Sequence, residues 1–192
     1  SAVGSFIIMI LLLGIFASVL FYTMDTLNKE GTGEKNIYEN KEMVSVLSEY
    51  GVPKYLSGNI TKEKVNGVSS VYTVLASLSN LYNFENPKNE FNISSFKSEG
   101  ITHYRMEQLY NGIKVYGHEL VMSVNEYGEV LSITGDYVPI KKLSNYSTLK
   151  ENEISDIVKE HAKENTTILS RERIIILDGN DGLVAYLVKV SI

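Results

Sequence analysis

The chain has 192 residues, a formal net charge of −5, no cysteine and three histidines. The negative charge argues against a nucleic-acid-binding protein, because such a protein needs basic side chains to neutralise phosphates. The absence of cysteine excludes a cysteine nucleophile, and three scattered histidines argue against a structural zinc site. Hydrophobic residues make up 44% of the chain, and they are unevenly distributed.

The most apolar segment is at the beginning and extends from Ser1 to Met24, and the first charged residue is Asp25. This length is sufficient for a helix that spans a bilayer. A signal peptide would start with a basic stretch before its apolar core. This chain starts inside the apolar run instead, so we expect that a basic leader has been removed. We predict a hydrophobic helix over residues 1–28, apolar on all faces.

This beginning resembles the mature N-terminus of type IV pilins. The resemblance is better to archaeal-type pilins and archaellins, because Ser5 stands where bacterial pilins carry a glutamate. It implies a helix that lies in the membrane before assembly and in the core of a filament afterwards. The predicted filament-core residues are Phe6, Ile7, Ile10, Leu13, Gly14, Ala17, Ser18 and Phe21. A simple single-span membrane anchor is the alternative interpretation.

Two helices are predicted after a polar, glycine-containing hinge that begins near Lys29. In the first, apolar residues at helical spacing precede Gly51 and Pro53, which would end the helix. These residues are Met43, Val46, Leu47 and Tyr50. The second helix has one apolar stripe, and Ser69 or Ser70 can cap its start. The stripe consists of Val71, Val74, Leu75, Leu78 and Leu81.

From His103 onward the hydrophobic period changes to two. The runs HYRMEQLY, GIKVYGHELVMSV and EVLSITGDYV are separated by Asn111-Gly112 and by NEYG, which are typical of hairpin turns. Thr148 and Glu151 can form a capping box for a further helix, and two final strands flank DGNDG. We therefore predict an α+β fold: a long N-terminal hydrophobic helix, then a head of helices packed on an antiparallel β-meander.

The segment from NLYNFENPKNEF to VLSITGDY resembles the propeptide of thermolysin- and fungalysin-type metalloproteases. Its THYR, YNGI and VYG stretches carry the resemblance, and the part from Thr148 to Ile192 resembles the PepSY module that follows in those precursors. The resemblance implies a region that assists folding of a protease and inhibits it. The expected regions are 1–28, a hydrophobic helix; 29–67, hinge and connecting helix; 68–140, propeptide-like; and 141–192, PepSY-like.

His118 and Glu119 stand together as at the start of the zinc-binding helix of many metalloproteases. That motif needs a second histidine four residues after the first, where this chain has Met122. The surrounding segment has the alternation of a strand, so we predict no zinc site there. DGNDG could offer oxygen ligands to calcium, but a hairpin turn is the favoured interpretation.

We predict neither a catalytic centre nor a cofactor, because no nucleophile with a base and no phosphate-binding loop is present in the sequence. Four sequons are candidates for glycosylation in a secreted protein. They begin at Asn59, Asn92, Asn145 and Asn165.

Two functions are compatible with the sequence. The first is a structural subunit of a type IV pilus-like filament at the cell surface, a homopolymer that passes through the membrane, uses a pilus assembly machinery and could serve adhesion. The second is a membrane-tethered, propeptide-like module that binds or inhibits a thermolysin-type metalloprotease.

Overall fold

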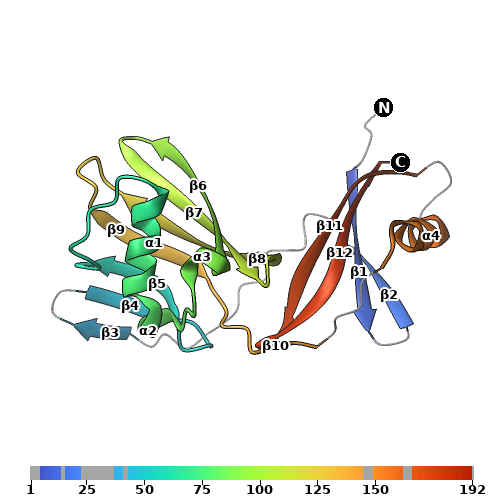
Figure 1. Ribbon diagram of the computed structural model, residues 1–192, viewed down its shortest axis with the longest axis horizontal. Helices are drawn as coiled ribbons and strands as arrows, with labels where there is room; N and C mark the ends of the chain where they lie inside the picture. Colours follow the sequence, from blue (N-terminus) through green and yellow to red (C-terminus); the bar gives the residue numbers. More distant parts are fainter. Residues whose placement is uncertain are drawn as a thin grey trace. The chain divides into compact units, whose positions relative to one another are not determined.

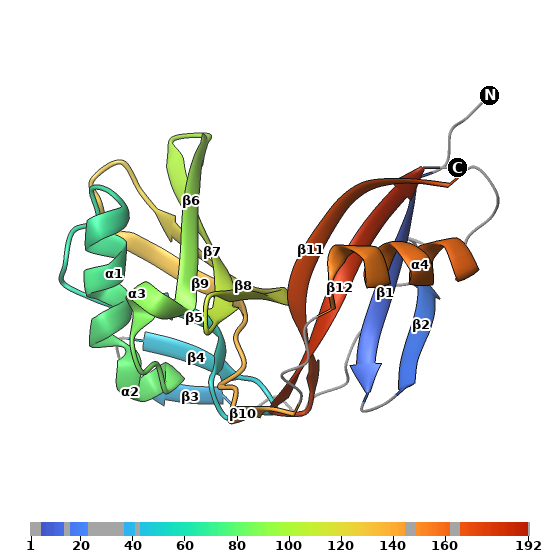
Figure 2. The ribbon, with the colours of Figure 1, turned by 45° about the vertical axis from the view of Figure 1, so that its right-hand side comes forward.

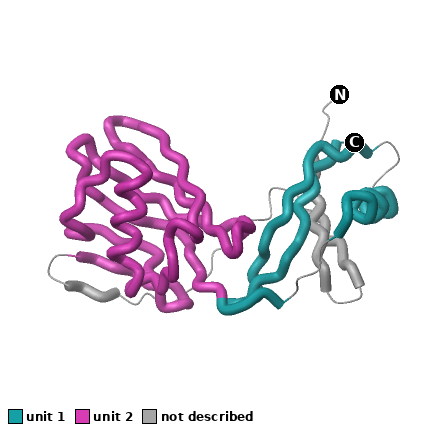
Figure 3. The backbone as a smooth tube through the Cα atoms, in the orientation of Figure 1, with its two compact units in different colours: residues 1–31, 141–192 teal, residues 32–140 magenta. Residues whose placement is uncertain are grey.

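The computed structural model describes residues 5–13, 16–22, 37–40, 43–144, 149–161 and 166–191. The chain divides into two compact units, which Figure 3 colours separately. Unit 1 contains residues 1–31 and 141–192, and unit 2 contains residues 32–140. Unit 2 is therefore inserted between the two segments of unit 1.

Unit 2 is built on an antiparallel sheet in which the strand order is β6-β7-β8-β9-β5-β4-β3 (Figure 1). The strands are β3 (Ile37–Asn40), β4 (Met43–Leu47), β5 (Pro53–Gly58), β6 (Phe91–Ser98), β7 (Ile101–Tyr110), β8 (Ile113–Val124) and β9 (Val130–Asp136). The predicted meander is confirmed as β7, β8 and β9. Asn111 and Gly112 have positive φ angles of 51° and 75°, which a tight hairpin turn requires.

Three helices cover one face of this sheet (Figure 2). They are α1 (Val68–Ser77), α2 (Ser79–Tyr82) and α3 (Pro87–Glu90). The predicted apolar stripe of the second helix is confirmed, since Val71, Val74 and Leu75 are fully buried. Ser70 does not occupy the cap position; its hydroxyl accepts hydrogen bonds from the backbone N–H groups of Asn66 and Gly67 at 2.9 and 3.2 Å.

One row of paired residues shows how the strands build the core. Ser45, Leu56, Ile133, Met122 and Tyr104 lie opposite one another on five neighbouring strands, and all five are buried. The face that carries this row and contacts the helices is called the inner face here. Because side chains alternate along a strand, the residues beside them point to the opposite, outer face.

Unit 1 contains a second antiparallel sheet with strand order β2-β1-β12-β11. Its strands are β1 (Ser5–Leu13), β2 (Phe16–Tyr22), β11 (Thr167–Asp178) and β12 (Asp181–Ser191), and the short β10 (Lys142–Leu143) pairs in parallel with β12. Helix α4 (Glu151–His161) packs its buried residues Ile154 and Val158 against β12. The predicted hairpin at DGNDG is confirmed, because Asp178 pairs with Asp181 around Gly179, whose φ angle is 59°.

The predicted helix over residues 1–28 is wrong. Its described residues form β1, which pairs with β12 from Ser5↔Ser191 to Leu11↔Ala185, and β2, which pairs with β1. A continuous apolar run suits a strand between two neighbours as well as a helix, so periodicity does not separate the two. The α+β class with a long N-terminal helix is therefore corrected to a mainly β fold.

The location in a filament that passes through the membrane depended on that helix, and it is corrected on the same finding. Among the helices of the described residues, none has the length and apolar character that a membrane crossing needs. The pilus interpretation is therefore withdrawn.

The predicted connecting helix near Met43 is also wrong, because Met43–Leu47 is β4. Ser45 is buried opposite Leu56 of β5, whereas Val44 beside it is exposed. This alternation is that of a strand. The helical spacing from Met43 to Tyr50 arose by coincidence across β4 and the turn that follows it.

Candidate binding face

Four polar side chains form a row across the outer face of unit 2. Asn92, Glu107, Glu119 and Asp136 lie opposite one another on β6, β7, β8 and β9. We call these four residues the charge row. Like charges directly opposite on neighbouring strands destabilise a sheet, so three adjacent carboxylates require compensation.

Three basic side chains supply that compensation. Lys114 Nζ lies 2.6 Å from Glu107 Oε1, Arg105 Nε lies 2.5 Å from Glu119 Oε2, and Lys54 Nζ lies 3.3 Å from Asp136 Oδ1. Asn92 Nδ2 also donates to Glu107 Oε2 at 3.3 Å. The outer face therefore carries a mosaic of both signs of charge.

The contacts of Glu107 favour its ionised form. The hydrogen bond from Lys114 lowers the pKa of Glu107, and Asn92 and Arg105 act in the same direction. The hydrogen bond to Glu119 raises the pKa of Arg105. With ion-paired, partly exposed side chains, the row can bind a complementary polar surface.

A bulge in β8 separates this row from the hairpin turn. Glu107 pairs with Glu119 and Leu109 pairs with Lys114, so residues 115–118 of β8 lie opposite Gln108 alone. Gly117 in the bulge has a φ angle of 77°, which glycine adopts without strain. Such bulges redirect side chains at the edges of sheets and at functional sites.

Gln108 is buried opposite the bulge, and its amide holds the backbone after β9. Its Nε2 donates to the carbonyl of Val138 at 2.7 Å, and the N–H of Val138 donates to Gln108 Oε1 at 3.1 Å.

His118 lies next to the charge row. Burial lowers its pKa, and the negative charge of Asp136 opposes this effect, so the imidazole is neutral at pH 7 and adds no charge to the face.

An aromatic cluster fixes both ends of the β6–β9 segment. The ring of Tyr137 lies 5.7 Å from that of Phe91 and 4.8 Å from that of Phe84, between ring centres. The Tyr137 hydroxyl donates to Glu90 Oε2 at 2.5 Å, and burial raises its pKa, so the phenol stays a neutral donor. The start and the end of the segment are thereby tied together.

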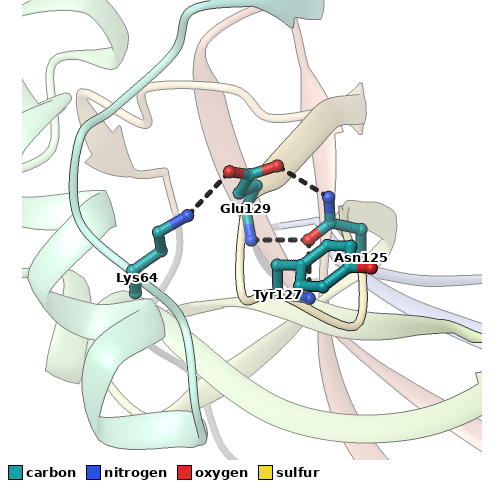
Figure 4. A network of polar contacts seen from close by, with 4 residues as sticks. All are labelled: Lys64, Asn125, Tyr127 and Glu129. Carbon is teal, nitrogen blue, oxygen red and sulfur yellow. Dashed lines mark hydrogen bonds and ion pairs between the residues drawn. The ribbon is translucent and has the colours of Figure 1, made fainter.

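A second polar group surrounds the turn between β8 and β9 (Figure 4). Glu129 accepts hydrogen bonds from Lys64 Nζ at 2.7 Å and from Asn125 Nδ2 at 2.8 Å, and the Lys64 contact lowers its pKa. The backbone N–H of Val65 donates to the Gly128 carbonyl at 2.8 Å. These contacts attach the 59–67 loop to the turn, beside an open hollow of about 510 Å³.

The hollow has no feature that selects a ligand. It is lined by the exposed side chains of Asn59, Lys62 and Lys64, together with Glu129 and Leu131. Because Lys64 is already paired with Glu129, we interpret the polar contacts around the β8–β9 turn as structural. In the parts of the chain that the structure covers, no cluster of three or more His, Asp or Glu side chains could hold a metal ion.

The predicted filament-core residues are divided between two strands. Phe6, Ile7, Ile10 and Leu13 belong to β1, and Ala17, Ser18 and Phe21 belong to β2. Gly14 lies outside the described residues, as do the sequon residues Asn145 and Asn165. Asn59 and Asn92 are exposed, and their glycosylation stays a prediction.

His118 and Glu119 lie in β8, so the prediction that they do not begin a zinc helix is confirmed. The charge row itself was missed at the sequence level. Its signal was the regular placement of charged residues between apolar ones, as in YRME and HELV, but the register across the bulge is needed to bring the carboxylates together.

Comparison with known proteins finds a propeptide motif in the segment that carries the charge row. The Fungalysin/Thermolysin Propeptide Motif matches residues 92–137, the segment from β6 through Tyr137. Bacillolysin of Brevibacillus brevis is 24% identical over 103 residues, which are 52% of this chain and 20% of bacillolysin. The chain therefore spans about a fifth of the length of this curated relative.

The solved C-terminal domain of Bacillus megaterium YpeB aligns with 95% of this chain and 77% of its own length, at 13% identity and a TM-score of 0.38. A similarity of this size carries no argument about this chain. The propeptide resemblance predicted from the sequence is confirmed for the matched segment. A propeptide motif is not a catalytic domain, which agrees with the prediction that the chain is not an enzyme.

Proposed function

We propose that this chain binds the catalytic domain of a thermolysin-type metalloprotease and inhibits it. The observation that carries the proposal is the match of a propeptide motif to residues 92–137. This segment supplies all four residues of the charge row and most of the outer face. The proposed binding surface and the matched motif are thus the same part of the chain.

The chemistry of the outer face supports recognition of another protein. Interfaces between separately folded proteins are about as polar as the rest of the surface, and complementary charges orient the partners. The mosaic of Lys54, Arg105 and Lys114 with three carboxylates can present both signs to a partner. Its ion pairs hold these side chains in position before binding, which reduces the entropy lost on association.

The C-terminal part is included in the same proposal. Residues 141–192 would form a PepSY-like module, since helix α4 is followed by the β11–β12 hairpin, the order of elements implied by the resemblance. Residues 68–140 would then be the propeptide-like part, and the region predicted as a connection at 29–67 would extend its sheet through β3, β4 and β5.

Inhibition of peptide hydrolysis tests this function. The whole chain is added in increasing amounts to the catalytic domain of a thermolysin-type metalloprotease, and the rate is measured with a short peptide substrate. We expect inhibition that saturates, and we expect Arg105→Glu to weaken it at least about tenfold, because the substitution adds a fourth acidic group beside Glu119. Lys159→Glu, at an exposed position of helix α4, is the matched charge reversal.

Circular dichroism of each variant must first show an unaltered fold. A serine protease that cleaves the same peptide should be unaffected. An unchanged rate of the metalloprotease at a hundredfold molar excess of the chain would contradict the proposed function.

A further inference from the structure

Strand β6 is at an edge of the unit 2 sheet. It pairs with β7 along its whole length, from Phe91↔Gln108 to Ser98↔Ile101. In the described part of the chain, no other strand pairs with β6. Alternate backbone N–H and C=O groups of an edge strand point away from the sheet and are available to another strand. In β6 the Phe91 carbonyl already accepts a hydrogen bond from the Tyr72 hydroxyl at 3.0 Å, so the open edge is the part that follows Phe91.

This edge has little of the usual protection against strand addition. Residues from Ser94 to Ser98 are all exposed, the strand has eight residues, and it contains no proline. Its one charged side chain is that of Lys97. Natural proteins block such edges with charged side chains, lysine above all, with proline or with bulges. Lys97 is the single such device in β6, since the β6–β7 register is continuous.

Phe96 provides an apolar anchor on the same strand. Its side chain is 55% exposed, and its ring stacks on the imidazole of His103, with 5.0 Å between ring centres and 24° between planes. His103 is opposite Phe96 on β7, so the stack supports the ring from the side of the sheet. A residue of an added strand would lie against the side of the Phe96 ring that faces the free edge.

From this geometry we infer that an extended segment of the protease partner adds to the free edge of β6; the inference rests on the proposed function and specifies its binding mode. Main-chain hydrogen bonds to β6 would supply affinity, and side chains on alternate faces would supply selectivity. An apolar residue would contact Phe96, and its neighbour in sequence would face Lys97. Because β6 carries a positive charge and no carboxylate, that neighbour is acidic.

Charge distinguishes this occupant from a second copy of the same chain. In a full-length antiparallel pairing of two β6 strands, Lys97 of each copy would lie opposite Asn92 of the other. Neither strand offers an acidic residue between Phe91 and Ser98 to pair with Lys97. A protease segment with an acidic residue next to an apolar one satisfies both side chains.

Amide hydrogen exchange tests the binding mode directly. The whole chain is measured alone and with a metalloprotease catalytic domain inactivated at its general-base glutamate, so that the chain is not cleaved. We expect the amides of β6 to exchange at least about tenfold more slowly in the complex, because added main-chain hydrogen bonds protect them. The amides of the 59–67 loop serve as the internal reference.

Two substitutions on β6 test the side-chain contacts. Phe96→Ser removes the anchor and Lys97→Glu reverses the charge, and each should raise the Kd for the same inactive protease about tenfold. Tyr127→Ser is the matched control, since Tyr127 is an exposed aromatic residue in the turn between β8 and β9. The control should leave the Kd unchanged, and the thermal midpoints of all variants should match that of the unaltered chain.

The outcomes separate the two proposals. Binding and inhibition without protection of β6, or with unchanged Kd values for both β6 variants, overturns the strand-addition mode and leaves the proposed function standing. No binding by the unaltered chain overturns both. Protection of β6 that depends on the concentration of this chain alone assigns the edge to a second copy and overturns the protease segment as its occupant.

Discussion

The two faces of the unit 2 sheet are formed by the same strands but have different chemistry. On the inner face, Leu56, Ile133 and Met122 are fully buried beneath the helices. On the outer face, Glu107, Glu119 and Asp136 follow one another across three strands, each with its own cation. The difference teaches that core packing and surface charge are separated by a single residue step along each strand. Each region can therefore be altered with little effect on the other.

The largest expected effect comes from neighbours on β9 that point to opposite faces. Ile133→Ala should lower the free energy of unfolding by about 2–5 kcal/mol, because it leaves a cavity in a packed core. Thr134→Ala, which changes the outer face, should lower it by less than about 1 kcal/mol. Chemical denaturation of both variants measures the difference. Equal losses would show that the faces are not separated in this way.

A smaller loss of stability is expected from substitution of Gln108, a polar residue on the inner face. Gln108→Ala leaves the N–H and C=O of Val138 without their side-chain partner, and an unpaired buried group costs about 1–3 kcal/mol. The neighbouring Glu107→Gln points outward and should cost less than about 1 kcal/mol. Hydrogen exchange at Val138 should also become faster in Gln108→Ala. An unchanged exchange rate there would contradict the assigned role of Gln108.

The next effect depends on pH. The folded pKa of His118 is lowered by burial, so the unfolded chain takes up the proton first as pH falls below the ordinary value of 6.5. Stability should therefore decrease from about pH 7 toward pH 5, a window in which carboxylates with ordinary pKa values remain mostly ionised. His118→Gln should show a flatter dependence in this window, whereas His161→Gln, on exposed helix α4, serves as the control. Identical slopes for all three proteins would exclude His118 as the cause.

The smallest effect is expected from the outer ion pairs. Lys114→Met removes the cation from Glu107, but the pair is partly exposed, so the loss of stability should stay within about 1 kcal/mol. The pKa of Glu107 should rise toward its ordinary range, which NMR titration of the carboxyl measures. Since a lowered folded pKa stabilises only above that pKa, the contribution of the pair should disappear in acid. A pKa of Glu107 that is the same in Lys114→Met would contradict this pairing.

The sequence predicted local elements better than long-range ones. The α1 stripe, the β7–β9 meander, α4 and the hairpin at DGNDG depend on neighbouring residues and are present as expected. Strand β1 pairs with β12 from the far end of the chain, and its continuous apolar run was predicted as a helix. Strand β4 pairs with its sequence neighbours β3 and β5, but its apolar residues and Tyr50 have helical spacing, so a helix was predicted there too. The free β6 strand was not assigned at all, because FNISSFKS has little apolar alternation.

The candidate binding face depended on information that one sequence does not contain. Glu107, Glu119 and Asp136 are brought together only because a bulge shifts the register of β8. A regular hairpin from Asn111-Gly112 would have aligned different residues. Single residues such as His118 could be assigned to a strand from their neighbours, whereas the charge row required the pairing itself.

The pairing of β1 with β12 has a consequence for the order of folding. These strands come from opposite ends of the described chain, so their contact closes a loop that contains all of unit 2. Closing a loop of that length is entropically costly and slow. On a ribosome, unit 2 can fold as soon as its own residues emerge, while β1 must wait for β12 to be synthesised. During that interval β1 can pair only with the adjacent β2. The side of β1 that later binds β12 is still open, so the apolar first segment is then most vulnerable to aggregation.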